Sequence, residues 1–264
     1  MKVMYIDCGM GAAGDMLTAA LLELLGSSAR AGFIEEFNGL GLPGVVMAAE
    51  TSVKCGVEGT RVHILINGAE EGEHTHHGTH AHTHTHNGMT EIGHIVKFHL
   101  NVPENVKEDI LNVYGIIADA ESKAHGVPVT EIHFHEVGNM DAIADVTAVC
   151  LLMDRIRPHK IAASSVATGN GTVRSAHGIL PVPAPATANI LEGIPSYSGE
   201  IRSELCTPTG AALLKYFVDE FGDMPEMQVE KCGYGMGAKD FERANCVRIS
   251  LGEVDYFSNG IDRA

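Results

Sequence analysis

The spacing of apolar residues over the first 66 positions predicts short strands and helices in alternation. A short apolar run at residues 2–6 is typical of a strand, and apolar residues then recur at helical spacing. Cys55-Gly56 separates two later runs of strand composition. The predicted elements are a strand at 2–6, helices at 16–25 and 29–38, and strands at 45–54 and 57–66. This βααββ unit predicts an α+β fold.

The rest of the chain predicts a loop followed by a larger mixed block. Residues 70–88 contain almost no apolar residue, so this segment cannot bury a core and is expected to be mobile. The predicted elements beyond it are helices at 91–98, 103–125, 139–155 and 207–221, strands at 160–166, 228–231 and 246–251, and a turn at 233–237. We therefore divide the chain into the βααββ unit (1–68), a His-rich loop (69–88) and a mixed α/β block (89–264).

Charge and composition exclude several classes of function. The chain has 264 residues, with 18 Lys and Arg against 34 Asp and Glu, and a net charge of −16. This field repels phosphate backbones and anionic lipid, and 5% aromatic residues without tryptophan argue against a base-stacking surface. We therefore expect no nucleic-acid partner and no membrane. The six scattered cysteines form no C-x-x-C pair, and no signal peptide is recognisable, which indicates a reducing cytoplasm.

Histidines are concentrated in the predicted loop. Neutral imidazole binds Ni²⁺, Zn²⁺, Cu²⁺ and Co²⁺, and spacings of two residues let an extended chain place several rings around one ion. The overlapping sites predict loose binding of more than one ion, with a neutral spacer or a purification tag as the alternative. The predicted ligands, called the histidine tract below, are His74, His76, His77, His80, His82, His84 and His86.

A glycine-rich turn, Gly9-x-Gly11-x-x-Gly14, lies between the first strand and the first helix. Its spacing is that of dinucleotide-binding turns, but the second strand with a terminal acid that such folds need is replaced by a helical stretch. Asp7 and Asp15 flank the turn and suit a metal ion better than a bare pyrophosphate. We expect the turn either to hold an ion or a phosphate at the helix N-terminus, or to be an ordinary βα turn.

A second polar cluster surrounds the start of another predicted helix. His133 and His135 face one side of a predicted strand end, and Glu136 follows them. Asp141 and Asp145 share one face of the helix, where like charges call for a cation or a histidine partner. The convergence of these side chains at a strand-to-helix junction predicts a site, and the alternative is a capped helix with a solvated acidic face.

Five segments carry a resemblance in chain order. They are Asp7-Cys-Gly-Met-Gly-Ala-Ala-Gly14-Asp15-Met16, the histidine tract, Phe134-His135-Glu136-Val137-Gly138 with Asp141 and Asp145, His177-Gly178-x-x-Pro181-Val-Pro183-Ala-Pro185-Ala-Thr187, and Thr207-Pro208-Thr209-Gly210-Ala211. As a set they resemble the nickel-insertion protein family of nickel-pincer cofactor biosynthesis, known as LarC, over nearly the whole chain. The resemblance implies insertion of Ni²⁺ into pyridinium-3,5-bisthiocarboxylic acid mononucleotide, which gives the nickel-pincer cofactor of lactate racemase.

The resemblance also implies further partners. In this family the insertion is driven by CTP, bound with Mn²⁺ or Mg²⁺ on a C-terminal domain that some members make as a separate chain. This sequence ends at Ala264, so we expect it to correspond to the first part alone. The separately made C-terminal domain is the expected partner. Lactate racemase and a second copy of the chain are further candidates.

Within this interpretation the histidine tract gathers Ni²⁺ and passes it to a mononucleotide bound near the glycine-rich turn. The predicted catalytic residues are His135, Glu136, Asp141 and Asp145, the predicted cofactor-binding residues are Asp7, Gly9, Gly11, Gly14, Asp15 and Thr207, and the predicted metal ligands are the histidine tract with His133 and His135. Thr207 is either an anion-binding position or a helix N-cap. Two alternatives stay open: a nickel store or chaperone without catalysis, and a nicotinamide-dependent oxidoreductase.

Overall fold

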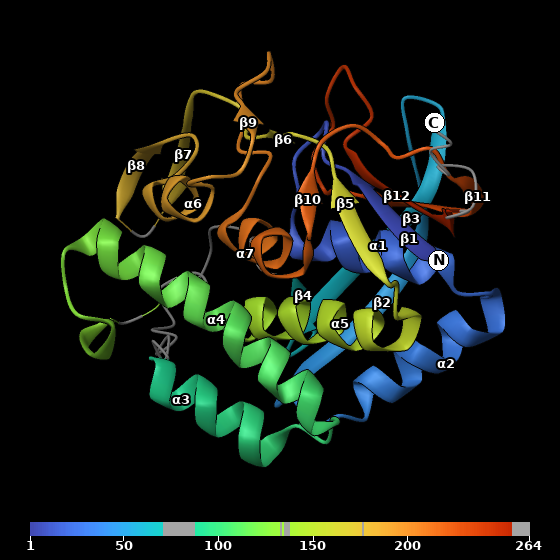
Figure 1. Cartoon of the computed structure of the whole chain (residues 1–264). Helices are drawn as coiled ribbons and strands as arrows, with labels where there is room; N and C mark the ends of the chain where they lie inside the picture. The colour runs from blue at the N-terminus through green and yellow to red at the C-terminus, as the bar shows by residue number, and fades with distance from the viewer. Residues whose placement is uncertain (71–87, 133, 135–137, 176, 255–264) are drawn as a thin grey trace, which may run out of the picture.

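The computed structural model describes residues 1–70, 88–132, 134, 138–175 and 177–254, and it confirms an α+β fold (Figure 1). The strands are β1 (Lys2–Asp7), β2 (Val45–Lys54), β3 (Val57–Ile66), β4 (Ala69–Glu70), β5 (Lys160–Ala163), β6 (Val166–Ala167), β7 (Thr172–Ser175), β8 (Gly178–Pro181), β9 (Ser196–Tyr197), β10 (Glu220–Phe221), β11 (Gln228–Met236) and β12 (Cys246–Glu253). The α-helices are α1 (Gly14–Leu24), α2 (Ser27–Asn38), α3 (Met89–His94), α4 (Glu104–His125), α5 (Met140–Ile156), α6 (Pro185–Ile190) and α7 (Pro208–Phe217). A π-helical turn (Ile95–His99) and a 3₁₀ turn (Val129–Glu131) complete the helical elements of this part.

Strand β1 lies inside the main sheet, with β12 antiparallel on one side and β5 parallel on the other. The strand order is β10-β5-β1-β12-β11-β3-β2, and β4 pairs with β3. The order β1-α1-α2-β2-β3 confirms the predicted βααββ unit. Strands from both ends of the chain thus share one sheet, and the division into three segments stays a prediction. The hairpin of β7 and β8 lies apart from this sheet (Figure 1).

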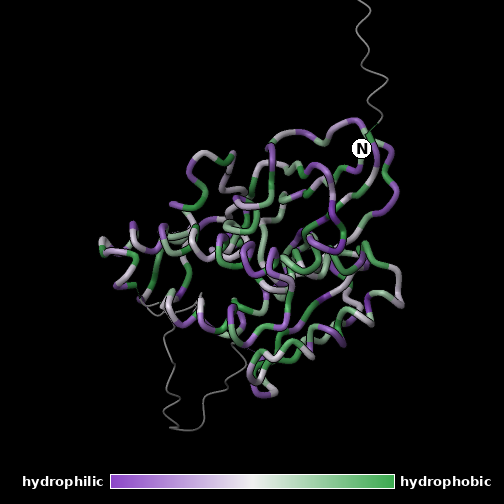
Figure 2. The backbone as a smooth tube through the Cα atoms, turned by 60° about the horizontal axis from the view of Figure 1, so that its bottom comes forward, coloured by the Kyte–Doolittle hydropathy of each residue, from purple (hydrophilic) through white to green (hydrophobic). Residues whose placement is uncertain are grey.

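The helices pack in layers against the main sheet. Helix α1 contacts β11 and β3, and α5 contacts both α1 and α4 (Figure 1). The apolar face predicted for α4, including Val106, Ile110 and Val113, is buried. Hydrophilic and hydrophobic residues are interspersed along the chain (Figure 2). Among the described residues, no helix has both the length and the hydropathy of a membrane span. In α5 every residue from 142 to 153 is buried, so the carboxyl of Asp145, which lies within this run, is enclosed by the fold.

Three predictions about the backbone are wrong. The helix predicted at 207–221 ends at Phe217, because the next residues pair with β5 as β10 and the Asp219 N–H donates to the carbonyl oxygen of Ile161 at 2.9 Å. The turn predicted at 233–237 mostly continues β11, which pairs antiparallel with β12. The strand predicted at 160–166 is divided into β5 and β6.

The glycines of β11 account for the second of these errors. A Cβ on Gly235 would lie 1.8 Å from the carbonyl oxygen of Met16, and one on Gly233 would lie 2.2 Å from that of Ala20. No side chain fits between the strand and α1, so the two elements pack backbone against backbone. Glycine in this strand reflects the close approach of a helix and not a turn.

This packing predicts that Gly235→Ala lowers the free energy of unfolding by about 1–3 kcal/mol, the cost of overpacking a tight contact. Gly115 is the matched control, because it lies within α4 and a Cβ there meets no atom within 4 Å. Gly115→Ala should raise stability by about 0.5–1 kcal/mol through helix propensity. Urea unfolding followed by circular dichroism measures both changes. A Gly235→Ala protein as stable as its parent would contradict the backbone contact.

Candidate functional site

Three helices begin around one cavity of about 260 Å³. Helix α1 contributes Asp15, α5 contributes Asp141 and Asp145, and the start of α7 contributes threonines. Strands β3 and β4 supply the opposite wall with Arg61 and Glu70. We call this space the acidic cavity, because four carboxyl groups line it. Among its described lining residues, Arg61 is the single basic side chain.

The glycine-rich turn fixes the start of α1 beside the start of α7. Gly11 has a φ of +83°, and its N–H donates to the carbonyl oxygen of Cys8 at 2.9 Å. A Cβ at this position would lie 2.0 Å from the Leu205 carbonyl oxygen. Ala12 donates to that same oxygen at 3.1 Å and accepts from the Thr207 N–H at 3.0 Å. The turn is therefore a packing device that holds two helix N-termini together.

Asp145 is the most constrained group of the acidic cavity. It is 8% exposed, and its Oδ1 has no hydrogen-bond partner in the described part of the chain. A Cβ on Gly14 would lie 2.5 Å from Oδ2, so only glycine lets α1 approach this carboxyl. Burial raises the pKa of Asp145 well above its ordinary value, and the charges of Asp141 and Asp15 raise it further. The Asp15 N–H opposes this shift by hydrogen bonding to the carboxylate.

This last contact bears on the dinucleotide alternative. The N-terminus of a helix attracts an anion through its free N–H groups. In α1 the Asp15 N–H instead bonds to the Asp145 carboxyl, and the Met16 N–H donates to the Asp15 side chain at 2.8 Å. The geometry therefore favours neither a phosphate at Gly14 nor a nicotinamide cofactor.

Asp15 titrates close to neutral pH. Burial raises its pKa to about 6, and the carboxylate of Glu70 adds to the shift. The Met16 N–H, which donates to Oδ1 at 2.8 Å, and the charge of Arg61 oppose it. Asp15 and Asp145 thus give the acidic cavity protons that an incoming cation can displace.

Thr207 is the N-cap of α7. Its Oγ1 accepts a hydrogen bond from the Gly210 N–H at 3.2 Å and lies 3.2 Å from the Thr209 Oγ1. This is the N-cap role that the sequence left open beside anion binding. Both threonines line the acidic cavity, where they add neutral oxygen atoms to the carboxylates.

The structure brings together some of the predicted site residues and separates others. Gly14, Asp15, Asp141, Asp145 and Thr207 all line the acidic cavity. The predicted ligands of the histidine tract, together with His133, His135 and Glu136, lie outside the described residues.

Asp7 and Gly9 lie elsewhere, in a second cavity with Arg248. The Asp7 carboxylate accepts from the Gly9 N–H at 3.0 Å and from Arg248 at 2.7 Å. Asp7 and Asp15 thus line different cavities, and the structure does not support an ion shared between them. Gly11 packs against the backbone of Leu205. It lines neither the acidic cavity nor the cavity that contains Asp7.

Sequence reasoning missed the β3–β4 wall of the acidic cavity. Arg61 lies 3.2 Å from Glu70, and the imidazole of His63 contacts Glu70 and lies 3.0 Å from Glu50. Arg61 and His63 alternate with the buried Val62 and Ile64 on β3, so the strand pattern carried the signal. Glu70 was missed because it is the first residue of the polar segment that precedes the histidine tract, which the sequence predicted to be a loop.

The acidic cavity has the donor chemistry of a cation site. Carboxylate and hydroxyl oxygens suit divalent ions, and Ni²⁺ accepts both oxygen and imidazole ligands. No three His, Cys, Asp or Glu side chains are already arranged to hold an ion within the described ranges. Any ion in the cavity therefore needs further ligands or a rearrangement of the carboxylates.

Comparison with known proteins gives the family. A sequence model described as "Nickel insertion protein" matches residues 4–262. The chain belongs to the nickel insertion protein family. This membership confirms the family resemblance that the five segments of the sequence carry as a set. No solved structure matches the chain.

Curated relatives carry a fuller name. Proteins named "Pyridinium-3,5-bisthiocarboxylic acid mononucleotide nickel insertion protein" include one from Clostridium kluyveri, 41% identical over 257 residues, covering 97% of this chain and 63% of the relative. A Geobacillus kaustophilus protein is 36% identical, covering 96% of this chain and 60% of its own length. One from Staphylococcus epidermidis is 37% identical, with 97% and 60% covered. The nickel insertion chain described here thus spans about 60% of the length of these relatives.

The raised pKa of Asp145 predicts a pH-dependent effect of Asp145→Asn. A carboxyl whose pKa is raised on folding destabilises the native state increasingly as pH rises above the unfolded pKa. Removing it should therefore stabilise the chain, by about 1 kcal/mol or more at pH 8 and by less at pH 5, because one pKa unit corresponds to about 1.4 kcal/mol. Urea unfolding at the two pH values measures the difference.

The exposed Asp223 provides the control, since Asp223→Asn removes the same charge outside the acidic cavity. Its effect should be within about 0.5 kcal/mol at either pH. A loss of stability in Asp145→Asn that grows with pH would show that the Asp145 carboxylate is favourably paired, contrary to this account.

Proposed function

We propose that this chain binds Ni²⁺ and delivers it to pyridinium-3,5-bisthiocarboxylic acid mononucleotide, as part of a nickel insertase. The observation that carries the proposal is the acidic cavity of this member of the nickel insertion family. There the buried Asp145 lies with Asp15 and Asp141 where three helices begin. The names of the relatives supply the substrate. Nickel is the cargo of the reaction and not a resident cofactor.

In this proposal the acidic cavity receives the ion by exchanging protons for it. Burial raises the pKa of Asp145 well above its ordinary value, so Asp145 holds a proton in the empty cavity, and Asp15, with its pKa of about 6, takes up a proton as the pH falls to that value. A divalent ion displaces these protons, because its charge compensates carboxylates that burial otherwise disfavours. Binding therefore weakens as pH falls below about 6.

The predicted ligands divide between capture and delivery. The histidine tract collects Ni²⁺ through imidazole nitrogens, and Asp141 and Asp145 hold the ion with His135 and Glu136 while the substrate is positioned. Carboxylate oxygens are weaker partners for nickel than thiocarboxylate sulfur, so transfer to the substrate runs downhill. The protein contributes the approach of the two reactants and the removal of water.

The remaining partners also belong to the proposal. CTP, bound with Mn²⁺ or Mg²⁺, drives the insertion from a part of the enzyme outside residues 1–264. Lactate racemase receives the finished cofactor. A nickel store or chaperone is the second candidate function, since storage needs only the histidine tract. The acidic cavity favours delivery over storage.

The double variant Asp141→Asn/Asp145→Asn separates these two functions. We expect it to bind nearly as much Ni²⁺ as the parent, because the histidine tract is intact, and to transfer at least about tenfold less nickel to the mononucleotide. The assay follows nickel in the small-molecule fraction by mass spectrometry, in the presence of the remaining part of the enzyme and CTP. Asp223→Asn is the control for loss of a carboxylate outside the acidic cavity. Undiminished transfer by the double variant would leave only storage for the chain.

A second prediction concerns the nucleotide. The glycine-rich turn packs against the Leu205 backbone and the Asp145 carboxyl, which leaves no room for a phosphate group. The carboxyl groups of the acidic cavity also disfavour a triphosphate. The isolated chain should therefore show no CTP binding with Mn²⁺ in isothermal titration. Micromolar affinity, about −8 kcal/mol, would place the nucleotide site within residues 1–264.

A further inference from the structure

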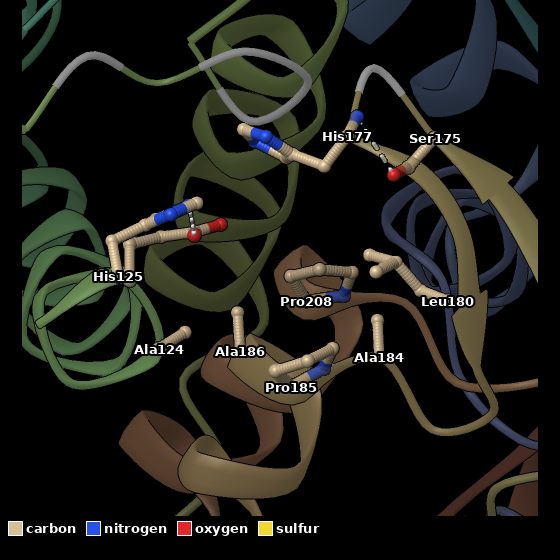
Figure 3. A pocket seen from close by; sticks show the side chains of 10 residues that line it. Ala124, His125, Ser175, His177, Leu180, Ala184, Pro185, Ala186 and Pro208 are labelled. Atoms are coloured by element: carbon tan, nitrogen blue, oxygen red, sulfur yellow. Dashed lines mark hydrogen bonds and ion pairs between the residues drawn. The ribbon is translucent and has the colours of Figure 1, made fainter.

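A third cavity, of about 180 Å³, lies on the other side of the start of α7. Its walls are largely apolar, with contributions from Leu180, Pro185 and Pro208. Two imidazoles from distant parts of the chain also line it. His125 is the last residue of α4, and His177 belongs to the short connection between β7 and β8 (Figure 3).

The two rings have the spacing of a pair that shares one ion. Their centroids are 4.7 Å apart with an interplanar angle of 53°. With metal–nitrogen bonds of about 2.1 Å, two imidazoles at neighbouring positions around a divalent ion place their centroids about 4.5–5 Å apart. The observed separation of 4.7 Å falls within this range.

Both histidines are also held in place. Glu121 Oε2 lies 3.4 Å from His125 Nε2, one helical turn away on α4. Metal-bound histidines commonly donate their second ring nitrogen to a carboxylate, which fixes the tautomer and raises the basicity of the ligand. The backbone N–H of His177 donates to Ser175 Oγ at 3.1 Å, and this hydrogen bond restrains the backbone at His177 between β7 and β8.

We propose that His125 and His177 form a two-imidazole site for Ni²⁺, in which Glu121 positions His125 and solvent completes the coordination. Imidazole pairs select nickel, zinc and copper over the hard ions that prefer oxygen. Pro208 lines this cavity while Thr207 and Thr209 line the acidic cavity. The site thus places an imidazole-bound ion directly across the start of α7 from the carboxylates. The imidazole pair is argued from its own geometry, and the choice of Ni²⁺ among these ions rests on the proposed function.

The test uses the full chain with the seven histidines of the tract replaced by asparagine, so that the tract does not mask the site. Ni²⁺ alone is titrated at pH 7.5 by isothermal calorimetry. His125→Ala/His177→Ala should lose one equivalent of bound Ni²⁺, and Glu121→Gln should weaken that equivalent about tenfold. The single variant His177→Gln, which keeps most of the side-chain volume, should lose the same equivalent.

The matched control is His94→Ala/His99→Ala, which removes another imidazole pair, with centroids 5.2 Å apart and no ion-pairing carboxylate among the described residues. It should leave that Ni²⁺ equivalent in place. Circular dichroism melting verifies that each variant is folded. An unchanged Ni²⁺ stoichiometry in the folded His177→Gln protein would overturn the proposal. An equal loss in the control pair would overturn it too, because any two exposed imidazoles would then suffice.

Discussion

Helix α1 and the turn before it are packed closely on several sides, and each of these contacts requires a glycine. Gly14 of the helix itself faces Asp145 of α5, and Gly235 of β11 faces the Met16 carbonyl. The start of α7 closes in through Gly210, whose Cβ would lie 2.1 Å from the carbonyl oxygen of Ala12. These close contacts hold the starts of α1 and α7 beside α5. The acidic cavity is the space that they enclose.

The same packing sets the electrostatics of the cavity. Enclosure of α5 removes Asp145 from water, and a carboxyl in such a place stays ionised only with a compensating charge. The N-terminus of α1 supplies part of that compensation, and the Oδ1 atom without a partner shows that it is incomplete. A cation in the cavity would complete it. A deficit of positive charge is thus built into the fold at the acidic cavity, where we propose that nickel binds.

Much of the fold could be predicted from the sequence, because helical and strand periodicity reports burial directly. The βααββ unit, α4 and α5 follow from it. The errors fall where tertiary contacts decide the backbone: glycines in β11 indicate a turn until α1 is known to lie against them, and the end of α7 depends on the pairing of β10 with β5.

The candidate site was predicted in part for a related reason. Asp141 and Asp145 share a helix face, a local property that the sequence reveals, and Gly14 and Asp15 belong to a local motif. Their meeting with Arg61 and Glu70 depends on the sheet register, which spacing alone does not give. Asp7 lies near Asp15 in the sequence, yet its pairing with Arg248 of β12 draws it into another cavity. The His125–His177 pair joins residues 52 positions apart and has no local signal.

The central claim is that the acidic cavity holds nickel on its way to the substrate. Nickel-edge anomalous diffraction from crystals of the chain grown with one equivalent of Ni²⁺ and the mononucleotide tests it most directly. The account predicts an anomalous peak inside the cavity, within bonding distance of Asp141 or Asp145, and its loss in the Asp141→Asn/Asp145→Asn protein. Anomalous density confined to histidines, with none in the cavity, would contradict it.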